Sequence, residues 1–237
     1  MHLKKVSIKH ERFPTREHYP FNLEIMQKTP GCPFTSPVTF FVGENGTGKS
    51  TLLEAVCRRC GIHIWEHEYR TRYEHNPFEH SLFQALDIEW YDGPVPGSYF
   101  ASQAFQNFAE ILDGWASSDP GMLKYFGGKS LMTQSHGQSL MSYFSSRYRL
   151  RGIYFLDEPE TALSPKTQLA LLEILKQAGE KGLAQFVIAT HSPILLSCPG
   201  ATIYSFDRVP LEPISYENTD HYRIYRDFMK ERENLPE

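Results

Sequence analysis

Three short hydrophobic runs dominate the pattern of apolar and polar positions along the chain. They are VTFFV at 38–42, IYFL at 153–156 and FVIA at 186–189. Nearly continuous runs of this length, bounded by turn-forming or polar residues, are typical of parallel strands buried on both faces. A further strand is expected at 201–207, where the segment ATIYSFD is again rich in β-branched and aromatic residues.

Helical periodicity fills two of the segments between these runs. Residues 49–60 would place Leu52, Leu53 and Val56 on one face of a helix. A second helix is expected after Ser164, whose side chain can cap it, with Pro165 at its first position. Strands that alternate with helices predict an α/β fold, with a mostly parallel central sheet flanked by helices.

The length of 237 residues suits one large domain, here expected to span residues 1–237. Residues 1–42 are expected to form a β-rich N-terminal antiparallel lobe, and residues 61–145 a helical insert. Residues 150–237 complete the domain and include a charged terminal helix at 219–233. The segment SSDPGMLKYFGGKS at 117–130 is typical of an exposed loop. The chain has no heptad run, so long coiled-coil arms are not expected.

Composition narrows the classes of function. The net charge of −4 provides no overall basic surface for nucleic acid. The densest basic run, SSRYRLR at 145–151, is more typical of a solvated segment than of a DNA contact. No apolar run reaches the roughly 18 residues of a membrane helix, and the N-terminal segment lacks the apolar centre of a signal peptide. A cytoplasmic protein with reduced thiols is therefore expected.

A CxxC pair at Cys57 and Cys60 is followed by His63 and His67. The gap between the cysteine pair and the histidine pair is shorter than in a zinc finger, and the cysteines fall on a predicted helix. Thiols on a core-facing helix are the favoured interpretation, with metal binding as the alternative.

The segment GENGTGKST at 43–51 fits the phosphate-binding pattern G-x-x-x-x-G-K-[ST], between a predicted strand and a predicted helix. Glycines let backbone N–H groups turn toward a phosphate, and a helix N-terminus favours negative charge. Lys49 is expected to reach the β- and γ-phosphates, and the Ser50 hydroxyl to bind Mg²⁺. The expected nucleotide-binding residues are Gly43, Glu44, Asn45, Gly46, Thr47, Gly48, Lys49, Ser50 and Thr51.

Two carboxylates, Asp157 and Glu158, follow the second hydrophobic run. They stand at the carboxyl end of a predicted parallel strand, where α/β sheets bind their ligands. Asp157 is expected to hold Mg²⁺, and Glu158 to orient and deprotonate an attacking water. A solvated acidic turn would be an equal alternative without the glycine-rich segment upstream.

The order of five segments resembles the ATP-binding-cassette (ABC) ATPases. In chain order, they are the glycine-rich segment at 43–51, TQSHGQSL at 133–140, the acidic strand at 152–158, PETALSP at 159–165 and IATHSP at 188–193. The resemblance spans about residues 36–207 and is greatest to the soluble branch, the SMC, RecF and AAA-type ABC ATPases. It implies that ATP and Mg²⁺ bind at composite sites of a head-to-tail homodimer.

The resemblance also implies roles for further residues. Ser135, Gly137 and Gln138 match the signature motif, which contacts the γ-phosphate held by the opposite protomer. His191 matches the switch histidine, which contacts the γ-phosphate within its own protomer. Residues 161–164 match the D-loop, which runs along the dimer interface.

Two departures from the family pattern are present. His136 stands where the signature motif usually has a glycine, and Ser164 stands where the D-loop often has an aspartate. The soluble relatives tolerate such changes, so neither predicts an inactive protein. Both leave the coupling between the two composite sites open.

For two functional positions, the sequence offers more than one candidate residue. The glutamine that reaches Mg²⁺ in the family matches Gln103 or Gln106, and Gln103 is favoured because it directly follows a strand expected at 98–102. The residue that stacks on adenine could be Tyr19, Phe21 or Arg12, although an aromatic side chain is more often part of a core.

The leading hypothesis is a soluble ABC-type ATPase that couples ATP hydrolysis to a partner, such as a nuclease, another effector or DNA, in repair or defence. One alternative is the ATP-binding subunit of an ABC membrane transporter, although a membrane partner is not favoured. Another is an ATP-switched clamp that dimerises without hydrolysis.

Overall fold

A six-stranded, mostly parallel sheet forms the centre of the protein. The computed structural model describes residues 1–64, 76–126, 128–133 and 136–233. The strand order is β5 (Gly97–Ala101), β6 (Gly152–Asp157), β7 (Ala184–Ala189), β3 (Val38–Val42), β8 (Thr202–Ser205) and β9 (Glu212–Ile214). All neighbours from β5 to β8 are parallel, and only β9 is antiparallel, to β8. The predicted fold class is confirmed.

A separate antiparallel sheet has the order β2 (Gly31–Pro33), β1 (Leu3–Ile8) and β4 (Leu86–Trp90). The antiparallel lobe was expected from residues 1–42 alone, but its third strand comes from beyond the phosphate-loop helix. The strand β4 is only partly buried and has no long hydrophobic run. Nothing in its pattern distinguishes it from the surrounding segment.

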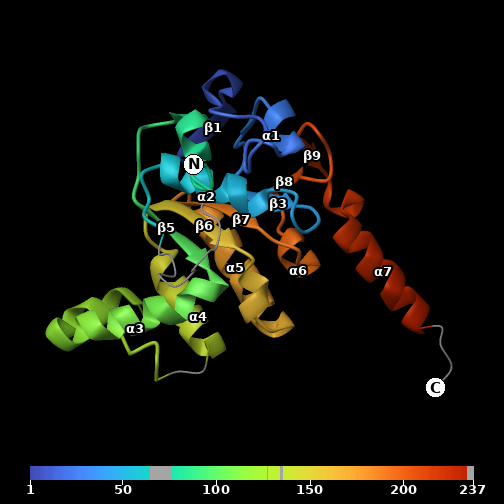
Figure 1. Ribbon diagram of the computed structural model, residues 1–237. Coiled ribbons are helices and arrows are strands. Elements are labelled where there is room, and N and C mark those ends of the chain that lie inside the picture. Colours follow the sequence, from blue (N-terminus) through green and yellow to red (C-terminus); the bar gives the residue numbers. More distant parts are fainter. Residues whose placement is uncertain (65–75, 127, 134–135, 234–237) are drawn as a thin grey trace.

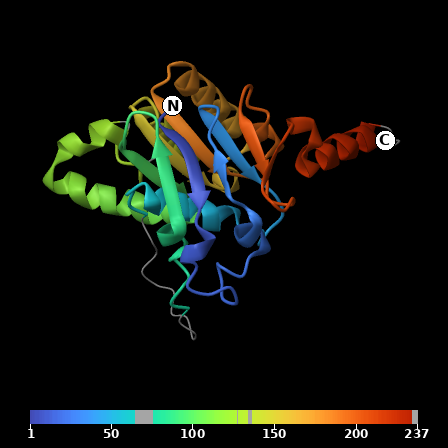
Figure 2. The same cartoon turned by 90° about the horizontal axis from the view of Figure 1, so that it is seen from above.

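Helices surround the central sheet and extend from it (Figure 1). The α-helices are α1 (Glu24–Lys28), α2 (Lys49–Arg59), α3 (Ser102–Ser118), α4 (His136–Arg147), α5 (Pro165–Glu180), α6 (Pro193–Leu196) and α7 (Asp220–Glu233). The short 3₁₀ helices are His10–Arg12, Leu82–Ala85, Pro120–Phe126, Pro159–Ala162 and Tyr216–Asn218. The sheet and its covering helices form the body, while α3 with α4 and α7 extend to opposite sides of it (Figure 2).

Two expected boundaries differ from the structure. The strand expected at 98–102 is β5 at Gly97–Ala101, and Ser102 already begins helix α3. The segment 117–130, expected to be an exposed loop, contains the end of α3 and the 3₁₀ helix Pro120–Phe126. Helix α5 begins as expected, because the Ser164 side chain accepts the Thr167 N–H and Pro165 occupies its first position.

The central sheet separates two hydrophobic clusters. Phe41 belongs to the cluster between this sheet, α2 and the antiparallel sheet. Its neighbour Phe40 belongs to the other cluster, with residues of α3, α4 and α5. Successive side chains of a strand point to opposite faces, so continuous apolar runs are what a sheet covered on both faces requires.

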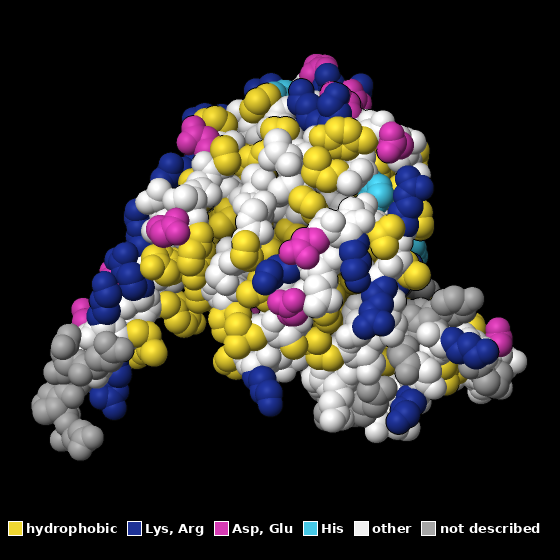
Figure 3. Space-filling model, turned by 180° about the vertical axis from the view of Figure 1, so that it is seen from behind, with side chains coloured by type: hydrophobic (Ala, Val, Ile, Leu, Met, Phe, Trp, Pro, Cys, Tyr) yellow, Lys and Arg dark blue, Asp and Glu magenta, His cyan; other side chains and the backbone are white. Residues whose placement is uncertain are grey.

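Helix α7 is amphipathic, but much of its apolar side is exposed. Ile224, Tyr225, Phe228 and Met229 are each more than half exposed. On the face shown in Figure 3, Lys and Arg side chains are scattered among Asp and Glu rather than gathered into one basic area. Within the described part of the chain, no helix combines the length and apolar character needed to span a membrane.

The fully buried amide of Gln185 joins the two sheets. Its Oε1 accepts the backbone N–H groups of His2 and Leu3, at 2.7 and 2.8 Å, and its Nε2 donates to Leu3 O at 2.9 Å. One side chain of β7 therefore satisfies three backbone groups at the start of β1.

We expect Gln185→Leu to lower the free energy of unfolding by about 3 kcal/mol, because buried backbone donors then lose their acceptor. Chemical denaturation monitored by circular dichroism measures the change. The control is Gln177→Leu on the exposed side of α5, with an expected change below about 0.5 kcal/mol. Equal effects of the two substitutions would contradict this role of Gln185.

Candidate functional site

The phosphate loop connects β3 to α2 and depends on glycine at Gly48. Gly48 has a φ of 101°, and a Cβ atom there would lie 3.1 Å from the side chains of both Leu23 and Met26. The left-handed backbone therefore favours glycine, and a larger residue would also press on these two side chains. The loop passes directly into helix α2, so its backbone lies at a helix N-terminus.

Lys49 begins α2 and is almost fully buried, with 4% of its surface exposed. Its Nζ donates to the carbonyl oxygens of Gly43 and Glu44, both at 2.8 Å. Burial lowers the pKa of Lys49, and four surrounding carboxylates oppose that shift. These carboxylates belong to Glu158, Asp207, Asp157 and Glu44.

Asp157, at the end of β6, joins two hydroxyl groups. Ser50 Oγ donates to one carboxylate oxygen at 2.8 Å, and the Tyr99 hydroxyl donates to the other at 3.0 Å. Burial raises the pKa of Asp157, and the two hydrogen bonds lower it. Ser50 and Asp157, two of the three residues expected at the metal position, are thus in direct contact. Their hard oxygen atoms are suitable ligands for Mg²⁺.

Glu158 has a left-handed backbone, with φ at 43° and ψ at 54°. It is the one residue other than glycine with positive φ in the described part of the chain. Its N–H donates to Ala189 O at 2.9 Å, and its carbonyl accepts the Thr161 hydroxyl at 2.8 Å. Strain of this kind persists where surrounding contacts fix the backbone, and it is concentrated at functional sites.

His191 follows β7 and lies beside Glu158, with 3.7 Å between His191 Nε2 and Glu158 Oε1. The His191 backbone N–H donates to Glu160 Oε1 at 2.6 Å. On the other side of the ring, His191 Nδ1 lies 2.8 Å from Nε2 of His221, which comes from α7. Burial is the main cause that lowers the pKa of both histidines.

Asp207 follows β8 and accepts the backbone N–H of Glu44 at 2.8 Å. Asp207 thereby holds the start of the phosphate loop from the β8 side of β3, whereas His191 approaches from the β7 side. Parallel strands carry the carboxyl ends of β3, β6, β7 and β8 to one edge of the sheet. Lys49, Asp157, Glu158, His191 and Asp207 therefore share one site.

The structure describes only part of the expected signature motif. Gly137 and Gln138 lie in the first turn of α4. A Cβ atom at Gly137 would meet nothing within 4 Å among the described residues, so none of these residues fills the space beside it. Ser135 lies outside the described residues. Gln103 lies in the first turn of α3, directly after β5, and its side chain is likewise outside the described part.

The candidates for adenine stacking have different environments. Phe21 is 1% exposed and belongs to the core. Arg12 forms an ion pair with Asp87 at 2.6 Å. Tyr19 is 40% exposed, and its hydroxyl lies 2.7 Å from Thr51 Oγ1 on the phosphate-loop helix. Tyr19 is thus the candidate beside the site.

The cysteine pair has the character of a core feature. Cys57 is buried and Cys60 partly buried, and burial raises the pKa of Cys57 above its ordinary range and that of Cys60 to about 12. In the described parts of the chain, no three His, Cys, Asp or Glu residues are grouped as metal ligands. His67 of the expected cluster lies outside those parts.

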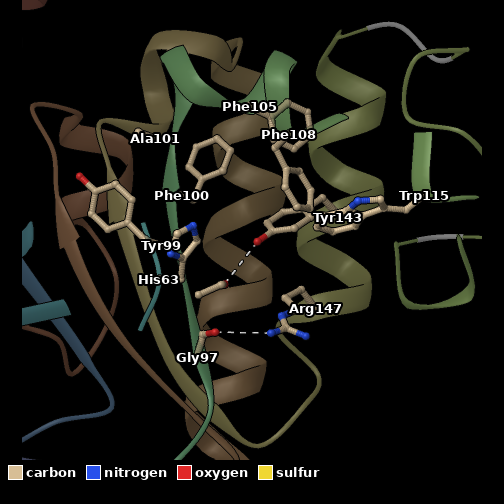
Figure 4. Close-up of a pocket in the computed structure, with 11 residues that line it drawn as sticks. His63, Gly97, Tyr99, Phe100, Ala101, Phe105, Phe108, Trp115, Tyr143 and Arg147 are labelled. Atoms are coloured by element: carbon tan, nitrogen blue, oxygen red, sulfur yellow. Dashed lines mark hydrogen bonds between the residues drawn. The ribbon is translucent and has the colours of Figure 1, made fainter. Parts of the chain in front are cut away.

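A pocket of about 230 Å³ lies behind the site, between β5 and the helices α3 and α4 (Figure 4). Aromatic side chains of Tyr99, Phe100 and Tyr143 line it, and Arg147 Nη2 donates to Gly97 O at 3.4 Å. Arg147 therefore faces inward, so the basic run at 145–151 does not present one arginine surface. Tyr99 connects this pocket to Asp157.

Three residues of the site were not predicted from the sequence: Tyr99, Asp207 and His221. Asp207 had a usable signal, because it ends a predicted strand as Asp157 does. Tyr99 lies within an ordinary strand pattern, and His221 has no motif around it. Their positions follow from tertiary contacts between distant segments.

Two family models match the chain. An AAA domain model described as a putative AbiEii toxin of a type IV toxin–antitoxin system matches residues 134–197, and another AAA domain model matches residues 22–61. No curated protein matches the chain at a significant level.

The protein is also similar to solved structures. An Smc head bound to the C-terminal winged-helix domain of ScpA has a TM-score of 0.51 and 9% identity, over 90% of this chain and 98% of that one. The SMC head domain from Thermotoga maritima has a TM-score of 0.47 and 14% identity, over 91% and 99% of the two chains. The first of these supports the SMC-head type of fold.

The fold and the site together define a P-loop ATPase domain. The two AAA models and the SMC-head type of fold agree with the resemblance to SMC- and RecF-like ABC ATPases that the order of the motifs indicated.

We expect Tyr99→Phe to lower the free energy of unfolding by about 2 kcal/mol in metal-free buffer at pH 7, because a charged carboxylate loses a hydrogen bond. The control is Tyr204→Phe, which removes a donor to the neutral carbonyl of Pro33 and should cost about 1 kcal/mol. Denaturant titrations measure both. A smaller effect at Tyr99 than at Tyr204 would contradict an ionised Asp157.

Proposed function

We propose that this protein binds ATP with Mg²⁺ and hydrolyses it at composite sites of a head-to-tail homodimer. The observation that carries the proposal is the convergence of Lys49, Ser50, Asp157, Glu158 and His191 at one edge of the sheet. They come from three separately predicted motifs, and their contacts match the chemistry that phosphoryl transfer requires.

Each residue has a role suited to its environment. The Lys49 ammonium exchanges its two carbonyl partners for phosphate oxygens, which are stronger acceptors. Ser50 and Asp157 would hold Mg²⁺, which would supply positive charge against the phosphate oxygens. Glu158 has a partly exposed carboxylate, and it accepts the proton of the attacking water. His191 donates a hydrogen bond to the terminal phosphate.

The second half of each composite site is proposed to come from the other protomer, through Ser135, Gly137 and Gln138. The space beside Gly137 and the location of Gly137 and Gln138 at the start of a helix support this role. A helix N-terminus that is open on its outer side favours an approaching phosphate. Gln103, at the start of α3, is proposed to approach the metal.

The partner is proposed to be a protein effector, such as a nuclease. The fold similarity to an Smc head bound to a ScpA domain and the match to a toxin–antitoxin AAA model support a protein-coupled role in repair or defence. On the face shown in Figure 3, the charges are dispersed and give no comparable support for DNA. A clamp without hydrolysis is disfavoured by Glu158, which stands in place as a base.

Glu158→Gln should convert the protein from monomer to dimer only when ATP and Mg²⁺ are both added, because removal of the base preserves the ATP-bound state. Size-exclusion chromatography with light scattering measures the mass. The control is the double variant Lys49→Ala/Glu158→Gln, which should remain monomeric. A mass that never responds to ATP would refute the composite homodimer.

The wild-type protein should release phosphate from ATP, and Glu158→Gln should lower kcat at least about 100-fold. Lys49→Ala should weaken ATP binding and abolish measurable turnover. A phosphate-release assay and calorimetric titration separate the two effects. Turnover that survives both substitutions would point to a contaminating enzyme and contradict the proposed activity.

A further inference from the structure

Helix α7 contributes His221 to the site, although neither the motifs nor the proposed mechanism includes this residue. The His191 and His221 rings are 5.0 Å apart between centroids, and Nδ1 of the first lies 2.8 Å from Nε2 of the second. A separation of 2.8 Å between two ring nitrogens leaves room for one hydrogen between them. The position of that hydrogen determines whether the other ring nitrogen of His191, Nε2, carries a hydrogen or a lone pair.

Two arrangements of a neutral pair are available. In the first, His221 carries its hydrogen on Nε2 and donates to His191 Nδ1, so that His191 carries its hydrogen on Nε2. In the second, His191 carries its hydrogen on Nδ1 and donates to His221, whose own hydrogen is then on Nδ1. Only the first arrangement gives His191 a donor on the Nε2 side.

The surroundings of both rings favour the first arrangement. Within the described structure, His221 Nδ1 and His191 Nε2 are both buried without a hydrogen-bond partner, so each arrangement leaves one N–H unpaired. The first arrangement turns the N–H of His191 Nε2 toward the Glu158 carboxylate, 3.7 Å away, where the negative charge attracts it. The second arrangement would turn the Nε2 lone pair of His191 toward the same carboxylate, which repels it.

The start of α7 fixes His221 in place. The buried Thr219 side chain accepts the Tyr222 N–H at 3.3 Å, as an N-cap does. The ring of Tyr222 packs on Tyr216 at 4.6 Å, and the Tyr216 hydroxyl donates to Pro193 O at 3.0 Å, two residues beyond His191. Helix α7 is therefore anchored beside the same loop that carries His191.

We propose that His221 is a positioning residue for ATP hydrolysis: it donates to His191 Nδ1 and so fixes the His191 tautomer that presents N–H to the terminal phosphate. This inference deepens the proposed function and rests on it. His221 itself does not touch the nucleotide. This hydrogen bond couples α7 to the site, because displacement of the first turn of α7 would remove the donor to His191.

The activity test compares three substitutions on α7. His221→Phe keeps a ring but removes the donor, and should lower kcat about tenfold with the KM for ATP changed less than about twofold. His221→Gln supplies an amide N–H and should restore kcat to within about threefold of wild type. Ile224→Ala, on the exposed side of the same helix, is the control and should leave both constants unchanged.

A double-mutant cycle tests whether His221 acts through His191. His221→Phe should have little further effect in a His191→Ala background, because the group that it positions is already absent. Independent, multiplicative losses would overturn the proposal. So would equal activity of His221→Phe and wild type.

A second readout needs no activity. Ring ¹⁵N shifts of His191, identified by their loss in His191→Ala, should show hydrogen on Nε2 in the wild type and a mixture of tautomers in His221→Phe. Hydrogen on Nδ1 in the wild type would overturn the inference even if the enzyme is active. Conversely, if hydrolysis does not depend on Lys49, the proposed function is refuted. The expected tautomer pattern in the same protein would still support the His221–His191 contact.

Discussion

The parallel register of four strands is the constraint on which the site depends. Asp157 at the end of β6 pairs with Ala189 of β7, and Ala189 pairs with Phe41 of β3. On the far side of β3, Val42 pairs with Ser205 of β8. The loops that follow these strands therefore leave the sheet at nearly the same level. A shift of one strand by one residue would move its functional side chains to the opposite face.

Electrostatics explains why these loops form a binding site: their buried charged groups are not fully compensated by the protein itself. Burial acts against charge on Lys49 and on Asp157, and Glu158 adds a like charge beside Asp157. The histidines next to them have lowered pKa values and contribute no compensating charge at neutral pH. The ammonium and the carboxylates thus gain most from ligands of opposite charge, a phosphate for the first and a cation for the second.

The sequence predicted the parts of the site that lie within one continuous segment. The glycine loop, the pair Asp157–Glu158 and the central strands each carry a local signature with a physical cause. The contacts of Tyr99 and His221 lack such a signature, because each joins segments that approach only in the folded chain. Strand β4 was missed for the same reason: its pairing with β1 spans the whole phosphate-loop unit. The local sequence pattern predicts the helices and strands, whereas tertiary packing determines which side chains from distant segments come into contact.

The position of β3 between β7 and β8 also affects how the chain emerges from the ribosome. The strand VTFFV is synthesised before both of its partners, which lie at residues 184–205. Until those residues are made, this apolar segment has two unpaired edges, and such segments attract other chains or holdase chaperones. Pairing over so long a separation also slows folding. The nucleotide site can therefore form only after β7 and β8 are made, and a nascent chain that ends before residue 205 lacks at least one of the two strands that flank β3.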